Sequence, residues 1–191
     1  METHMSKPVL LGISGSLRGG SYNTKLIREA ARLFGPADFA EADLRLPLYD
    51  GDLEDAEGIP ASVQRLADQI AGADAVIIST TEYNKAPSGV LKNALDWVSR
   101  TDGAPWKDKP VAIMSATGGR AGGERTQFAL RLMMVPFQPN LLMGPEVLVG
   151  NTSDQFDASD RLTNARNAKA LGALMKRLRE AAGFPAAEAA A

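Results

Sequence analysis

Short apolar runs alternate along the chain with segments whose apolar residues recur at helical spacing. Most of these runs are continuous, which is typical of strands buried on both faces of a parallel sheet. The second run is weaker, and Gly144 and Pro145 interrupt the last one. The predicted strands are Val9 to Ile13, Asp38 to Leu44, Ala75 to Ser79, Val111 to Met114, and the two pieces Leu141 to Met143 and Val147 to Val149.

The segments between the strands predict helices. Val63, Leu66, Ala67 and Ile70 recur at positions i, i+3, i+4 and i+7, which indicates an amphipathic helix ending near Gly72. The other predicted helices contain Leu26 to Ala31, Val90 to Val98, Gly123 to Met134 and Leu171 to Leu178.

This alternation of strand and helix, repeated about five times, predicts a doubly wound α/β fold with helices on both faces of a parallel sheet. Residues 1–191 are expected to form a single domain, with loose ends at 1–6 and 185–191. In such sheets a ligand binds beyond the carboxyl ends of the strands. The loops after Ile13, Ser79 and Met114 are therefore the candidates for a binding site.

The composition of the chain argues against several classes of function. The formal net charge of -2 over 191 residues offers no basic field for nucleic acid or a membrane surface. No apolar run is long enough for a membrane span, and the polar start lacks the core of a signal peptide, so a cytoplasmic protein is expected. Cysteine is absent and His4 is the single histidine, which leaves no thiol chemistry and disfavours a histidine-based triad or metal site. A redox function would need a bound cofactor.

The loop after the first predicted strand, Ser14 to Asn23, contains three glycines and opens into a helix. Glycines and a helix N-terminus together direct N–H groups at one point, which suits a phosphate. Ser16 and Ser21 can add hydrogen bonds, as can Asn23, and Arg18 supplies a cation. The loop matches neither the dinucleotide fingerprint nor the triphosphate loop. A simple polar turn, with Ser21 as the helix cap, is the alternative.

Gly15-Ser16-Leu17-Arg18 followed by Gly20-Ser21-Tyr22-Asn23 resembles the phosphate loop of the NADPH-dependent FMN reductase family, which includes bacterial quinone, chromate and azo-dye reductases. Leu46 to Asp50 resembles the family's proline-containing loop, and Glu82 to Asn84 with Gly89 to Trp97 resembles its best-known signature. The resemblance implies a flavodoxin-like fold with five parallel strands, bound FMN, and NADH or NADPH as electron donor. It places Ser16, Leu17, Arg18, Ser21, Tyr22 and Asn23 at the cofactor.

The same resemblance implies that two further loops border the flavin ring. Relatives commonly carry proline at the position of Thr81 and a Ser-hydrophobe-Pro run at Ala86-Pro87-Ser88, so the chain departs from the pattern there. Lys85 could raise the flavin potential or attract an anionic substrate, or it could be a solvated loop lysine. The implied ring contacts are Glu82, Tyr83, Asn84, Lys85, Ser115, Thr117 and Gly118.

The resulting hypothesis is an FMN-dependent NAD(P)H oxidoreductase that passes electrons to quinones or other small acceptors such as chromate, ferric chelates or azo dyes. Because the chemistry takes place at the flavin N5, no catalytic side chain is required. The alternatives are a flavodoxin-like electron carrier, a reductase that releases free reduced FMN, and an interaction module without chemistry. The resemblance and the apolar cluster Leu132 to Val135 imply a homodimer or homotetramer.

Overall fold

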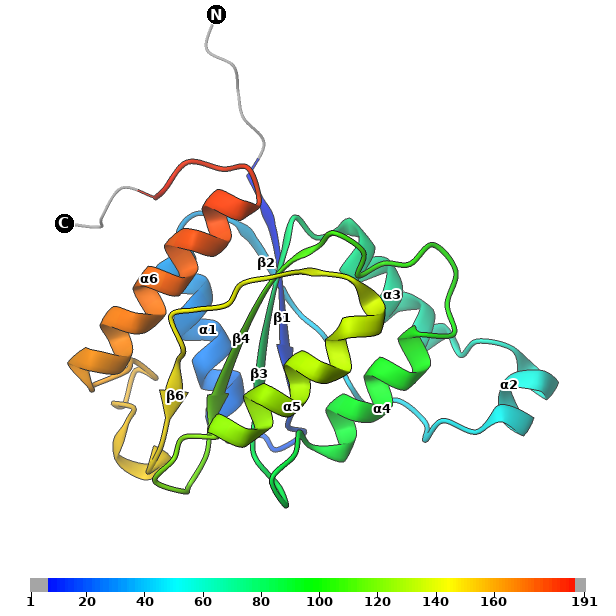
Figure 1. Cartoon of the computed structure of the whole chain (residues 1–191), viewed down its shortest axis with the longest axis horizontal. Helices are drawn as coiled ribbons and strands as arrows, with labels where there is room; N and C mark the ends of the chain where they lie inside the picture. Colours follow the sequence, from blue (N-terminus) through cyan, green and yellow to red (C-terminus); the bar gives the residue numbers. More distant parts are fainter. Residues whose placement is uncertain (1–6, 188–191) are drawn as a thin grey trace, which may run out of the picture.

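A parallel sheet organises the chain in the computed structural model, which describes residues 7–187 (Figure 1). Four strands lie side by side in the order β2-β1-β3-β4, and both β5 and β6 pair with β4 on its other side. All strand pairs are parallel. The strands are β1 (Val9–Ser14), β2 (Asp38–Glu41), β3 (Ala75–Thr80), β4 (Pro110–Ala116), β5 (Asn140–Leu141) and β6 (Leu148–Val149).

Helices cover both faces of the sheet, as the pattern predicts. Successive strand residues point to opposite faces, so Leu10 and Ile77 join one core while Leu11 and Ile78 join the other. Helices α1 (Tyr22–Phe34) and α6 (Ala165–Ala181) cover the first face, and α3 (Ala61–Gly72), α4 (Gly89–Val98) and α5 (Glu124–Met134) cover the second. The flavodoxin-like doubly wound fold is therefore confirmed.

The interrupted last strand is confirmed as two short pieces along β4. Residues Asn140–Leu141 pair with the start of β4, and Leu148–Val149 pair with its end. Residues 142–147 form no strand pairing with β4, so the last predicted strand is divided into β5 and β6. Strand β2 is shorter than predicted, because pairing with β1 ends at Glu41 and the residues up to Leu44 run on as a loop.

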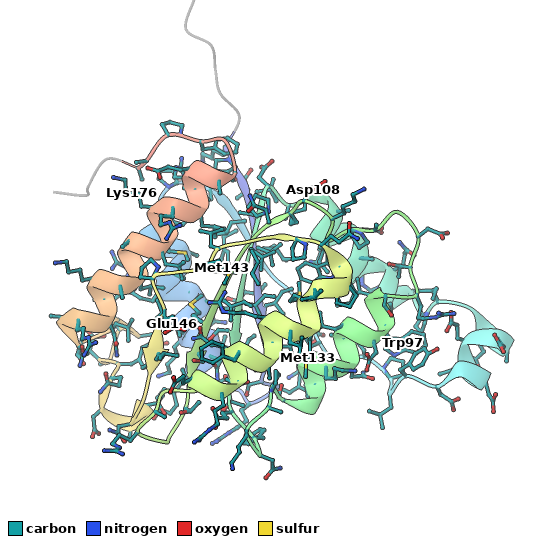
Figure 2. All side chains as sticks on the ribbon, in the orientation of Figure 1. Trp97, Asp108, Met133, Met143, Glu146 and Lys176 are labelled. Carbon is teal, nitrogen blue, oxygen red and sulfur yellow. The ribbon has the colours of Figure 1, made fainter. Side chains whose placement is uncertain are left out.

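Helix α2 (Gly51–Glu57) was not predicted, because it buries no residue and so has no apolar period. Asp50 caps its start, its side chain accepting from the Asp52 N–H. The loop before it is held by Trp97, which is fully buried on α4 and donates its indole N–H to the Pro47 carbonyl at 2.8 Å. Helix α2 lies at the far end of the molecule from α6, and Trp97 is labelled beside it in Figure 2.

Of the two segments expected to be loose, 1–6 and 185–191, the structure describes residues 185–187. Residues 1–6, with His4, and 188–191 lie outside the described residues. The Pro185 carbonyl accepts a hydrogen bond from Arg179 Nε at 2.7 Å, which holds that part of the C-terminal segment against α6. Within residues 7–187, no helix is both long and apolar enough to span a membrane, and no cluster of metal-ligating side chains occurs.

A buried carboxylate ties α1 to the segment before α6. Glu29 is 3% exposed and accepts two hydrogen bonds from Arg32 and one from Arg161, at 2.8 to 3.1 Å. Burial by itself raises the pKa of Glu29. The hydrogen bonds from the two arginines outweigh burial and hold the pKa below its ordinary value of 4.5. The ionised form therefore contributes stability above pH 4.5, which is lost as the pH falls through the lowered pKa.

Glu29→Gln should lower the free energy of unfolding at pH 7 by about 2 kcal/mol, because it weakens the hydrogen bonds between a buried carboxylate and two half-exposed guanidinium groups. It should also flatten the decline in stability below pH 4.5. Urea unfolding between pH 3 and pH 7 measures both effects. Glu41→Gln is the control, since the half-exposed Glu41–Arg28 pair should contribute less than about 1 kcal/mol. Parallel pH profiles for the Glu29 variant and the wild type would contradict the account.

Candidate functional site

A cavity of about 400 Å³ lies at the carboxyl ends of β1, β3 and β4, where the predicted loops meet. This is the end of a doubly wound sheet at which ligands bind. Its lining is made of Ser16, Arg18, Gly20, Ser21, Tyr22, Asn23, Thr81, Glu82, Tyr83, Ala116, Thr117, Gly118, Gly119, Ala121, Gly123 and Thr152.

A larger cavity, of about 700 Å³, lies elsewhere between α4, α5 and the loop before β4. Its walls include Leu95, Trp106 and Phe137 and are mostly apolar. These residues end helices or precede strands, so the cavity lies toward the amino ends of the strands. It lacks the converging loops and the helix N-terminus of the smaller cavity. The smaller cavity is therefore the candidate site.

Asn23 joins the start of α1 to the ends of two strands. Its Oδ1 accepts from Ser79 Oγ at 2.8 Å and from the Ala116 N–H at 3.1 Å, and its Nδ2 donates to the Ala116 carbonyl at 3.0 Å. The side chain is 4% exposed. The amide was predicted to contact the cofactor, but the structure engages it with β3 and β4 instead. What Asn23 can offer a ligand is its backbone N–H.

The N-terminus of α1 presents free donors to the cavity. Ser21 caps the helix, its Oγ accepting from the Thr24 N–H at 3.3 Å. The N–H groups of Tyr22 and Asn23 have no hydrogen-bond partner among residues 7–187. The first turn holds no acidic residue, so the positive end of the helix dipole is uncompensated. This end of the cavity fits a phosphate.

Close packing fixes the start of the phosphate loop. The Gly15 N–H donates to the Ser79 carbonyl at 2.8 Å, and Ser88 Oγ donates to the Gly15 carbonyl at 2.6 Å. A Cβ at position 15 would lie 2.8 Å from Thr80 Oγ1, so only glycine fits there. Ser88 also caps α4, its Oγ accepting from the Leu91 N–H. Ser88 belongs to the part of the signature that departs from the family pattern.

The loop after β3 ends in a tight turn from Tyr83 to Ala86. These two residues exchange N–H···O bonds of 3.1 and 3.0 Å, and Asn84 and Lys85 at the tip have φ of 51° and 67°. Positive φ at both central residues is the geometry of a type I′ turn. Tyr83 is 59% exposed at the mouth of the cavity, while Asn84 and Lys85 lie outside the lining.

Glu82 connects this loop to α5. Its Oε2 accepts from the Thr126 N–H at 3.3 Å, and Thr126 Oγ1 donates to the Thr81 carbonyl at 3.2 Å. Gly123, the residue before α5, has no side chain to cap the helix. The Glu82 carboxylate therefore serves as the cap, and it fixes the loops after β3 and β4 relative to each other.

Ser115 lies beneath the third loop and does not line the cavity. It is fully buried, donates its hydroxyl to the Gly122 carbonyl at 2.6 Å and accepts from Gln127 Nε2 at 2.8 Å. Gly123 has a φ of 90°, and a Cβ there would lie 2.8 Å from Ser115 Oγ. The contact predicted for Ser115 is thus replaced by a role in shaping the loop that carries Thr117 and Gly118.

The structure brings most of the predicted site residues together. Ser16, Arg18, Ser21, Tyr22, Asn23, Glu82, Tyr83, Thr117 and Gly118 line the cavity. Leu17 faces the neighbouring hollow beside β2. Thr152 was missed, because β6 brings it to the cavity from a segment with no motif. Gln127 was missed as well, since a buried glutamine on a helix gives no sequence signal.

Comparison with known proteins agrees with this geometry. The model of the NADPH-dependent FMN reductase family matches residues 8–154. An NAD(P)H-dependent FMN reductase of Pseudomonas aeruginosa is 45% identical over 155 residues, 80% of this chain and 83% of that protein. A quinone reductase of Escherichia coli is 40% identical over 147 residues, 75% of this chain and 78% of that protein.

Among solved structures, a flavoenzyme NAD(P)H:(acceptor) oxidoreductase of Paracoccus denitrificans superposes with a TM-score of 0.82 at 30% identity, covering 92% of this chain and 97% of that one. FMN and NAD(P)H are accordingly the cofactor and the electron donor of this chain, which acts as an FMN-dependent NAD(P)H oxidoreductase. The family match, the phosphate loop and the fold agree, and the chain belongs to the NADPH-dependent FMN reductase family.

Proposed function

We propose that the cavity at the carboxyl ends of β1, β3 and β4 holds FMN with its phosphate at the start of α1. The observation that carries this proposal is the pair of free N–H groups of Tyr22 and Asn23, aimed from a helix end that has no acidic residue. Arg18 and Ser16 line the same end and supply a cation and a hydroxyl. Phosphate oxygens bind such donors strongly because the hydrogen bonds are charge-assisted.

The flavin ring would then lie between the loops after β3 and β4. Thr117 and Gly118 border one side, and Glu82 and Tyr83 border the other. Thr126 holds Glu82 in place, so the two walls keep a fixed separation. The cavity volume of about 400 Å³ lies within the usual range for small-molecule sites. The exposed Tyr83 at the mouth can pack against whichever ligand enters next.

Quinones are the acceptor class that we propose. FMN supplies hydride acceptance from NAD(P)H and two-electron delivery to the acceptor when it is bound. The residues of this chain bind and orient the two substrates in turn at the open mouth. The quinone reductase of Escherichia coli and the similarly named relative of Pseudomonas putida support the acceptor class. We place the reaction in the cytoplasm, which cell fractionation checks.

Steady-state kinetics with NADPH and a soluble benzoquinone test the proposed function. One shared site predicts ping-pong behaviour, with parallel double-reciprocal lines, because the first product must leave before the quinone enters. Added free FMN should leave the rate unchanged, which separates this activity from release of free reduced FMN. Intersecting lines would contradict the shared site. Absence of NAD(P)H oxidation by the FMN-loaded protein would favour the electron-carrier alternative.

We also propose that a second copy of the chain covers the outer face of α5. Phe128 and Leu132 on this helix are 59% and 73% exposed, and Val135 and Met143 after it are 65% and 73% exposed. Figure 2 shows Met143 on the same side of the molecule as α5, the helix that carries Met133. Large apolar side chains gathered on one face are typical of an interaction surface. A symmetric dimer would bury this surface against itself.

Leu132→Glu should shift the protein to a smaller species, because a carboxylate would be buried in the apolar contact. Size-exclusion chromatography with light scattering measures the mass. Leu48→Glu is the control, since Leu48 is 81% exposed and lies on the loop before α2, away from this surface. A monomeric wild type, or an unchanged mass for the Leu132 variant, would contradict the proposed interface.

A further inference from the structure

A second polar cavity, of about 560 Å³, adjoins the FMN cavity on the outer side of β6. The two cavities share the loop after β4 as a wall, and Ala121 lines both of them. Gly150 packs directly against this wall, so closely that a Cβ there would lie 2.6 Å from the Arg120 carbonyl oxygen. The Asn151 N–H also donates to the Gly119 carbonyl. A ligand at the mouth of the FMN cavity can therefore extend across the shared loop into the second cavity.

Two arginines from different elements line this second cavity. Arg120 comes from the shared wall and Arg166 from the first turn of α6. Neither makes an ion pair or a side-chain hydrogen bond within residues 7–187, whereas Arg28, Arg32 and Arg100 all pair with glutamates. Glu146 is the one carboxylate in the lining and lies beside β6 in Figure 2. The cavity therefore carries a net positive charge that suits an anion.

The rest of the lining suits a sugar and a base. Four side-chain amides, each both donor and acceptor, contribute to it: Asn151, Gln155, Asn164 and Asn167. Asn164 caps α6, and no acidic residue lies in the first turn of that helix. A cation such as Arg166 in a first turn is unfavourable for the helix dipole, so helix stability does not explain it. A bound anion would offset both the charge of Arg166 and the positive end of the α6 dipole.

We propose that this cavity binds the phosphorylated adenosine end of the nicotinamide coenzyme, with Arg120 and Arg166 holding the 2′-phosphate of NADPH. The inference rests on the proposed function, in which the nicotinamide lies at the mouth of the FMN cavity. NAD(P)H is the substrate that needs two adjoining sites, because its nicotinamide and its adenosine lie at opposite ends. A guanidinium pair binds a phosphate through charge-assisted, directed hydrogen bonds. NADPH is then preferred over NADH, since only NADPH carries the 2′-phosphate.

Calorimetric titration of the FMN-loaded protein with adenosine 2′,5′-bisphosphate, and separately with adenosine 5′-monophosphate, tests this site without turnover. The wild type should bind the bisphosphate about tenfold more tightly or better, in keeping with hydrogen bonds between charged groups. Arg166→Gln and Arg120→Gln should each remove most of that difference. Arg65→Gln is the matched control, because Arg65 is exposed on α3 and lies outside the cavity.

Kinetics with the same variants give the second readout. Arg166→Gln should raise KM for NADPH about tenfold and leave KM for NADH and kcat with the quinone unchanged. Equal binding of the two nucleotides by the wild type, or an Arg166 variant that keeps the preference for the bisphosphate, would overturn the inference while leaving the proposed function intact. Failure of the wild type to oxidise either coenzyme would instead overturn the proposed function, whatever the titration shows.

Discussion

The site depends on one buried side chain, that of Asn23. A helix N-terminus binds a phosphate only if it is held at the right place relative to the strands that carry the rest of the site. Asn23 does this with three hydrogen bonds, to the Ser79 hydroxyl at the end of β3 and to both backbone groups of Ala116 at the end of β4. Removing the amide would leave several buried polar groups without partners, each at a cost of about 1–3 kcal/mol. Asn23 therefore fixes the start of α1, and with it the phosphate end of the cavity, relative to the ends of β3 and β4.

The remaining loops are held by the same kind of contact between distant segments. Ser88 donates to the Gly15 carbonyl, and Glu82 caps α5 through the Thr126 N–H. Some side chains that the family resemblance places at the cofactor, such as Asn23 and Glu82, thus hold the backbone of the loops in position. What remains to meet ligands is mainly backbone N–H groups, a few hydroxyls, and arginines that form no ion pair among the described residues. Such a site binds and orients, which is sufficient where the cofactor carries the chemistry.

Much of the fold could be predicted, because buried strands leave continuous apolar runs in the sequence and amphipathic helices leave apolar residues at helical spacing. Helix α2 could not, since it buries nothing and is held by local caps and by Glu54 with Arg100. The phosphate loop was predictable from its glycines and polar residues, but the engagement of Asn23 was not. Its partners are 56 and 93 residues away, and only the folded sheet brings them together. The second cavity has no motif either, because its amides and arginines come from three separate segments.

Titration of the apoprotein with FMN and with riboflavin, for the wild type and for Asn23→Ala, tests most directly whether Asn23 builds a phosphate site. The wild type should prefer FMN by roughly 100-fold, as expected for two or more hydrogen bonds to a charged phosphate. In a variant that keeps its circular dichroism spectrum, Asn23→Ala should lower the affinity for FMN about tenfold or more and leave that for riboflavin nearly unchanged. Equal affinities of the wild type for FMN and riboflavin, or a folded variant that keeps the full preference for FMN, would contradict the account.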